Sequence, residues 1–165
     1  MRRSGFKQKP RKPLKHTPLK KKSRIKYRGT SDTSVIKEKI QSTLREICLL
    51  RDKKCILWGV KCNHEVGMEG LVWQAEHLVE RSNSVSYADS RLVVLVERSC
   101  HGWKHFTKSN HDQYDEWVRQ KLSPERVRLW DAVRADQRAH RTHKVDWKLE
   151  LLALQKELSA LTKQV

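Results

Sequence analysis

The sequence predicts an α+β fold in which helices flank a small stranded core. Apolar residues recur at helical spacing over residues 31–51 and again after residue 100, while short apolar stretches interrupted by glycines fill residues 55–96. Residues 1–30, in contrast, are rich in lysine and arginine and hold few large apolar side chains. We therefore divide the chain into an arm (1–30), a core with an N-terminal helix (31–122) and a C-terminal helical extension (123–165).

The arm is expected to be disordered and to bind a polyanion. It contains 13 of the 36 basic residues, no acidic residue and three of the four prolines, so it carries most of the formal net charge of +17. Such a segment buries too little apolar surface to offset its ordering entropy, and clustered cations bind phosphates without reading sequence. DNA is the expected partner, and RNA is also compatible with this charge. The candidate nucleic-acid-binding residues are Arg2, Arg3, Lys7, Lys9, Arg11, Lys12, Lys20, Lys21, Lys22 and Arg24.

Helices are predicted on both sides of the strands. An apolar stripe over Ile36–Cys48 predicts a helix that ends near Arg51. A second helix is expected over Cys100–Gln120 with Phe106 among its apolar members, and Pro124 is a typical first-turn residue of a third. The strands between these helices are predicted at Cys55–Trp58, at Leu71–Trp73 leading into Ala75–Leu78, and at Leu92–Val96.

The C-terminal segment has a heptad-like apolar pattern. Its members alternate steps of four and three residues and are Trp147, Leu151, Leu154, Leu158, Leu161 and Val165. The pattern lasts for fewer than three heptads, which favours packing on the protein's own core over a coiled coil. A short helix that dimerises or binds a partner protein is the alternative.

The residues that can carry chemistry gather in two places, each following a predicted strand. Glu76 and His77 form the first group, and the second is the segment Cys100–His105. His101 and His105 stand four residues apart, so on a helix both imidazoles reach one metal ion. If the strands bring His77 against this pair, its imidazole can take a proton from water beside a bound cation. That chemistry, next to a basic arm, fits hydrolysis of a phosphodiester bond.

This arrangement resembles the HNH (His-Me finger) endonucleases, whose ββα fold binds one divalent metal ion. The opening Met1–Lys7 and the Pro-Leu-Lys repeats that follow it at 13–15 and 18–20 are further similar to small phage-encoded proteins of the NinG-like recombination-nuclease kind. The resemblance implies that His77 is the general base, that His101 and His105 are metal ligands, and that Glu76 is a further ligand or orients the site. Mg²⁺ or Mn²⁺ is the expected ion, and imidazoles also hold Zn²⁺ or Ni²⁺ firmly.

The sequence departs from the family pattern at its middle position. The family has an asparagine that orients the base histidine, whereas the corresponding segment here reads Asp89–Ser90–Arg91–Leu92. Asp89 or Ser90 could replace it, or Asn83 could reach in from the preceding loop. The expected function is a metal-dependent DNA endonuclease of low sequence specificity, acting in phage recombination or processing. The alternative is a non-catalytic nucleic-acid-binding accessory protein, for recombination or packaging, on a degenerate HNH scaffold.

The cysteines indicate either a structural zinc site or buried thiols. Cys55, Cys62 and Cys100 would need His64 or Cys48 as a fourth ligand to complete a tetrahedral site. No signal peptide or apolar run long enough to cross a bilayer is visible, so we expect reduced thiols, no membrane partner and a cytoplasmic protein. For a phage protein this compartment is the cytoplasm of the bacterial host.

Overall fold

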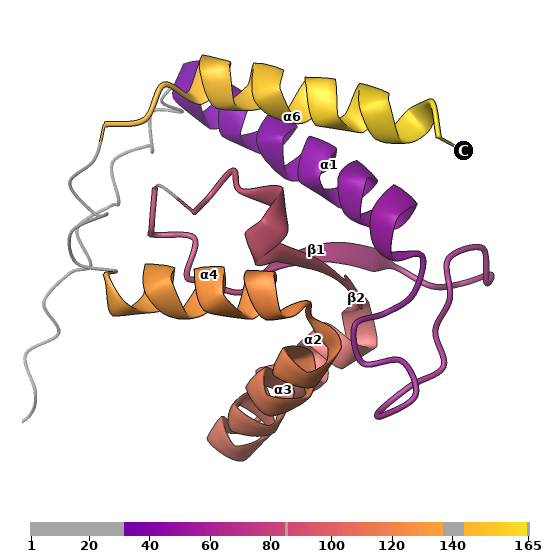
Figure 1. Cartoon of the computed structure of the whole chain (residues 1–165). Coiled ribbons are helices and arrows are strands. Elements are labelled where there is room, and N and C mark those ends of the chain that lie inside the picture. The colour runs from indigo at the N-terminus through magenta and orange to yellow at the C-terminus, as the bar shows by residue number, and fades with distance from the viewer. Residues whose placement is uncertain (1–31, 85, 137–143, 165) are drawn as a thin grey trace, which may run out of the picture.

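The computed structural model describes residues 32–84, 86–136 and 144–164. Its elements are α1 (Asp32–Asp52), β1 (Trp73–His77), the 3₁₀ turn η1 (Ser90–Leu92), β2 (Val93–Glu97), α2 (Arg98–Lys104), α3 (Lys108–Lys121), α4 (Pro124–Ala135) and α6 (Trp147–Thr162). Figure 1 shows helices around a small two-stranded sheet, and buried residues of both form one core, so the predicted α+β class is confirmed. The basic arm and Val165 lie outside the described residues.

The sheet is a single antiparallel pair that brings the two chemistry-bearing segments together. Trp73 pairs with Glu97 and His77 pairs with Val93, so the end of β1 lies beside the start of β2. Every residue of β2 is buried, because α1 and α2 both contact the sheet. α2 follows β2 directly, and the Glu97 side chain caps it by accepting a hydrogen bond from the Ser99 N–H at 2.7 Å.

A half-buried arginine joins the C-terminal end of α1 to β2. The Arg51 guanidinium donates to the carbonyls of Ser90 and Val93, each at 2.8 Å, and pairs with Asp52 at 2.6 Å. The Asp52 carboxylate in turn accepts the Leu95 N–H at 3.1 Å. These hydrogen bonds offset the free-energy cost of removing the two charged side chains from water, and they fix α1 on β2.

The C-terminal helix α6 packs along α1, where Figure 1 shows the two helices side by side. Leu154 is buried, and four other members of the heptad pattern pack half-buried against the core: Trp147, Leu151, Leu158 and Leu161. Within the described residues this stripe faces the chain's own core, as the first of the two sequence interpretations expects. None of the helices in the described ranges is long and apolar enough to cross a membrane.

Two element predictions are wrong. Residues 55–58 form turns with isolated bridges rather than a strand, because the backbone folds back so that Trp58 bridges Cys62. The predicted helix over 100–120 is two helices, α2 and α3, because the Thr107 hydroxyl caps a new start by accepting the Asn110 N–H at 3.1 Å. Phe106 lies in the break and is 84% exposed instead of buried.

Candidate metal centres

The first candidate centre is a cluster of one carboxylate and two imidazoles. Glu76 comes from β1, His101 from α2, and His105 from the residue that ends α2. Glu76 Oε2 lies 2.9 Å from His101 Nε2, which lies 3.3 Å from His105 Nε2. Because the three donor atoms converge within 4.8 Å of one another, this cluster could hold a metal ion.

Lys104 lies against this cluster, and the sequence analysis did not single it out as a site residue. Its side chain is buried, forms an ion pair with Glu76 Oε1, and lies with Nζ 4.6 Å from the centre of the Tyr114 ring. Burial by itself would raise the pKa of Glu76, but Lys104 and the two histidines lower that pKa overall. Glu76 is therefore ionised, with one oxygen held by the lysine and the other beside His101.

His77 is held next to this cluster as a neutral imidazole. Its Nε2 lies 3.0 Å from the Tyr87 carbonyl, and Gln41 of α1 approaches the same nitrogen at 3.4 Å. The carbonyl is the nearer partner and only accepts hydrogen bonds, so Nε2 carries the hydrogen and Nδ1 keeps its lone pair. The Gln41 amide nitrogen is also a donor, so in this tautomer it makes no hydrogen bond to the ring. Burial lowers the pKa of His77, which favours the neutral form that can accept a proton.

One cavity joins these groups. It has a volume of about 420 Å³, and its lining includes Glu76, His77, His101 and His105. The lining also includes Arg81, His111 and Arg134, the last paired with Asp115 at 3.0 Å. His111 had no predicted role, since neither spacing nor a neighbouring motif links α3 to the strands. A cavity with a base, a candidate cation site and arginines on its wall has groups that can bind a phosphate ester.

The structure also places the three residues considered in place of the family's asparagine. Asp89 caps η1 by accepting the Arg91 N–H at 3.0 Å, and the Ser90 hydroxyl donates to Glu157 of α6 at 2.8 Å, so both serve other partners. Asn83 is fully buried and accepts the Ser86 N–H at 3.3 Å. Since the next residue is Tyr87, whose carbonyl faces His77, Asn83 supports the loop that orients the imidazole.

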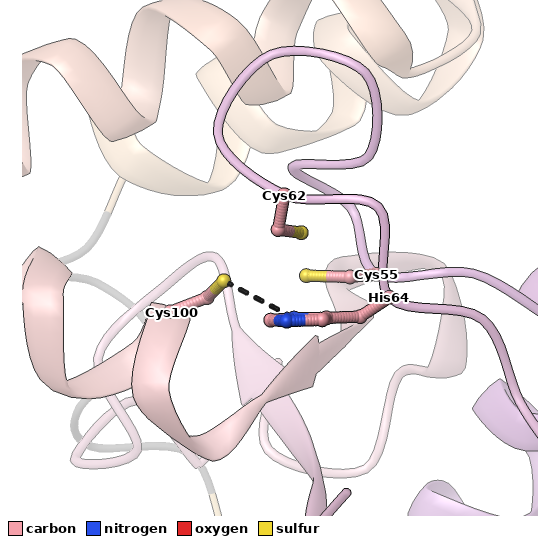
Figure 2. Close-up of side chains that lie close together, drawn as sticks. All are labelled: Cys55, Cys62, His64 and Cys100. Atoms are coloured by element: carbon pink, nitrogen blue, oxygen red, sulfur yellow. Dashed lines mark hydrogen bonds between the residues drawn. The ribbon is translucent and has the colours of Figure 1, made fainter. Parts of the chain in front are cut away.

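The second candidate centre is a cluster of three cysteines and one histidine. Figure 2 shows Cys55, Cys62 and His64 on one loop, with Cys100 reaching them from α2. Their ligand atoms lie within 4.8 Å of one another, and Cys100 Sγ is 3.7 Å from His64 Nδ1. Such a set could hold a metal such as zinc, for which Cys₃His is a common tetrahedral site.

The loop geometry explains how cysteines seven residues apart meet. Gly59 has a φ of 75°, a conformation that residues with a Cβ rarely adopt, and its N–H bonds the Cys62 carbonyl at 2.8 Å. The Cys55 N–H bonds the His64 carbonyl at 3.0 Å, which closes the loop on itself. The contact with Cys100 lowers the pKa of Cys55 to about 6, so a thiolate is available.

Of the two alternatives for the fourth ligand, the structure brings His64 and not Cys48 to the cluster. Cys48 is wholly buried in α1, with its sulfur 3.5 Å from Arg51 Nη2. Burial raises the pKa of Cys48 to about 12, so this thiol stays protonated.

No family model, curated protein or solved structure matches the chain.

Proposed function

We propose that this protein is a metal-dependent endonuclease of the HNH (His-Me finger) type that hydrolyses DNA phosphodiester bonds with low sequence specificity. The observation that carries the proposal is the neutral His77 lining the same cavity as Glu76, His101 and His105. Two antiparallel strands followed directly by α2 hold these residues, the order expected of a ββα-metal core. A role in phage recombination or DNA processing follows only from the resemblance of the sequence.

In this proposal His77 activates the attacking water. Its Nε2–H is donated to the Tyr87 carbonyl, so Nδ1 is the atom that accepts the proton. Lys104 holds one oxygen of Glu76 and leaves the other beside the imidazoles. A divalent ion held by Glu76, His101 and His105 would stabilise negative charge on the phosphate and the leaving oxygen. The carboxylate suits Mg²⁺ or Mn²⁺, and the two imidazoles also suit Zn²⁺ or Ni²⁺.

The Cys₃His cluster is assigned a structural role. Cys55, Cys62, His64 and Cys100 would bind zinc and fasten the loop that follows α1 to α2. The arm would supply affinity for the DNA backbone through Arg2, Arg3, Lys20, Lys21, Lys22 and the other basic residues of residues 1–30.

Nicking of supercoiled plasmid DNA tests the proposal. The wild-type protein is incubated with EDTA and then with Mg²⁺, Mn²⁺, Ni²⁺ or Zn²⁺, beside the variants His77→Ala and His101→Ala. We expect metal-dependent nicking that falls by about 10²–10⁴-fold in His77→Ala, because general-base catalysis contributes rates of that order. Gln113→Ala, an exposed change on α3, serves as the control and should nick normally.

Binding measured on the same proteins separates the two functional hypotheses. If DNA binding survives in His77→Ala while nicking is lost, the histidine acts in catalysis. If no metal supports nicking by the wild-type protein although salt-sensitive binding is strong, the protein is the non-catalytic accessory protein of the alternative hypothesis.

A further inference from the structure

The first residue of α6 contacts the loop between the two strands. The Trp147 and Tyr87 rings meet edge to face, with centroids 5.3 Å apart and planes at 76°. This geometry is favourable because the positive edge of one ring meets the negative face of the other. The Asp146 side chain caps the helix at the same point by accepting the Lys148 N–H at 3.0 Å. Trp147 therefore reaches Tyr87 from a defined helix start.

A lysine of α1 lies over both rings. Lys37 Nζ is 4.3 Å from the centre of the Trp147 ring and 5.3 Å from the centre of the Tyr87 ring. An ammonium at such distances from aromatic rings is attracted by their electrons. α1 and α6 lie side by side (Figure 1), so each helix supplies one contact to the Tyr87 side chain, which is buried.

Tyr87 is also the residue whose backbone carbonyl faces His77. His77 Nε2 lies 3.0 Å from this carbonyl, and the two rings have centroids 5.6 Å apart. Tyr87 lies in a turn rather than in β1 or β2, so strand pairing does not fix its backbone. The position of the carbonyl therefore depends on the contacts of the Tyr87 side chain and on the neighbouring turn, in which Asn83 accepts the Ser86 N–H.

Resting on the proposed function, we propose that Trp147 is a positioning residue for His77 and acts through the Tyr87 carbonyl. Trp147 holds the Tyr87 ring, the carbonyl accepts the Nε2–H of His77, and Nδ1 keeps its lone pair for the proton of the attacking water. Trp147 is not among the residues that line the cavity, so it acts without touching the substrate. The C-terminal helix then aligns the base as well as stabilising the fold.

The first measurement reads the tautomer of His77 and needs no cleavage. Nitrogen NMR spectra of the full-length protein with isotope-labelled histidine are recorded about two pH units above the ordinary histidine pKa, so that imidazoles are neutral. The His77 signals are those missing from His77→Gln. In the wild type Nε2 should carry the hydrogen. In Trp147→Ala the ratio of the tautomers should shift roughly two- to ten-fold toward Nδ1–H, the change that loss of one hydrogen bond produces.

Nicking kinetics give the second readout. In Trp147→Ala kcat should fall roughly ten- to a hundred-fold, because a small misplacement of a catalytic group has an effect of that order. KM should change less than about two-fold, since no substrate contact is removed. Trp147→Phe keeps an aromatic ring toward Tyr87 and should restore both kcat and the tautomer ratio. Trp147→Leu keeps apolar contact with the core but no aromatic ring, so it should behave like Trp147→Ala and replaces that variant if alanine prevents folding.

Leu158→Ala is the matched control. It removes another half-buried member of the heptad pattern from α6, about 16 Å further along the helix at 1.5 Å per residue. It should lower the temperature of thermal unfolding, as Trp147→Ala does, and leave both kcat and the His77 tautomer ratio unchanged. An unchanged tautomer ratio in Trp147→Ala, or the same shift in Leu158→Ala, would overturn the inference.

The two proposals fail separately. A shifted tautomer ratio in Trp147→Ala together with no nicking by the wild type would retain the link from α6 to His77 and reject the nuclease. Metal-dependent nicking by the wild type together with an unchanged ratio in Trp147→Ala would retain the nuclease and reject the positioning role of Trp147.

Discussion

Lys104 determines how Glu76 can serve a cation. A buried ammonium needs a partner, and here it takes one carboxylate oxygen, so Glu76 offers a single oxygen to the side of the histidines. The lysine also adds positive charge beside the cluster. Both effects weaken binding of a cation compared with a free carboxylate. Lys104 stands between His101 and His105 in the sequence, but lysines are so common on helix surfaces that its burial was not predictable.

The four cysteines make a matched set for a metal-content measurement. Cys55 and Cys100 belong to the Cys₃His cluster, whereas Cys48 is equally buried but lies apart from it. We expect the purified protein to contain one zinc ion bound by thiolates, and Cys100→Ser to lose it because hard oxygen is a poor replacement for sulfur. Cys48→Ser should keep the metal. Elemental analysis of the dialysed proteins measures both.

A zinc content that falls in Cys48→Ser, or that stays complete in Cys100→Ser, would contradict this assignment. The residue types of the cluster were evident from sequence, but the choice between His64 and Cys48 was not. That choice depends on the loop closed around Gly59, and a spacing of seven residues does not encode such closure.

At the scale of elements, α6 gives a direct measure of how the C-terminal segment contributes to stability. Leu154 is buried against the core, and Leu152, two positions earlier on the same helix, is 54% exposed. Leu154→Ala should lower the free energy of unfolding by about 2–5 kcal/mol, because it removes buried methyl groups and leaves a cavity. Leu152→Ala should change it by less than about 0.5 kcal/mol. Urea denaturation of both variants measures the difference.

Equal destabilisation by the two substitutions would show that α6 does not pack on α1 in solution. Periodicity predicted this helix and the stripe that it turns to the core, since the heptad pattern is continuous over the whole element. It failed at Phe106, where apolar residues continue at helical spacing through a break that only the Thr107 cap marks. It also failed at residues 55–58, where an apolar run typical of a strand closes a turn.

For the whole molecule, charge is divided between the arm and the folded part. Of the formal net charge of +17, the arm holds +13 and the other 135 residues hold the remaining +4. Replacing Lys20, Lys21 and Lys22 with glutamine should weaken binding to all DNA sequences alike. If each lysine contacts one phosphate, the slope of log affinity against log salt should become shallower by about 2–3, since each contact contributes about 0.9. Fluorescence anisotropy at several salt concentrations measures this slope.

An unchanged slope would remove the arm from the DNA interface. Lys54, Lys61 and Arg98 of the folded part, replaced by glutamine together, form the control, because they lie outside the cavity lining and the arm. The prediction of a polyanionic partner for the arm rests on composition alone, since counterion release depends on charge and not on shape.

One short helix joins the two candidate metal centres. Cys100 belongs to the thiol-rich cluster, and its neighbour His101 belongs to the cluster with Glu76, so two successive residues of α2 belong to different candidate metal centres. If zinc fastens Cys100, it also fixes the position of the imidazole beside it. In a cell short of zinc, the chain would then still contain Glu76, His101 and His105 but would not hold them in alignment. The supply of zinc would thus limit binding of a metal ion at the other centre.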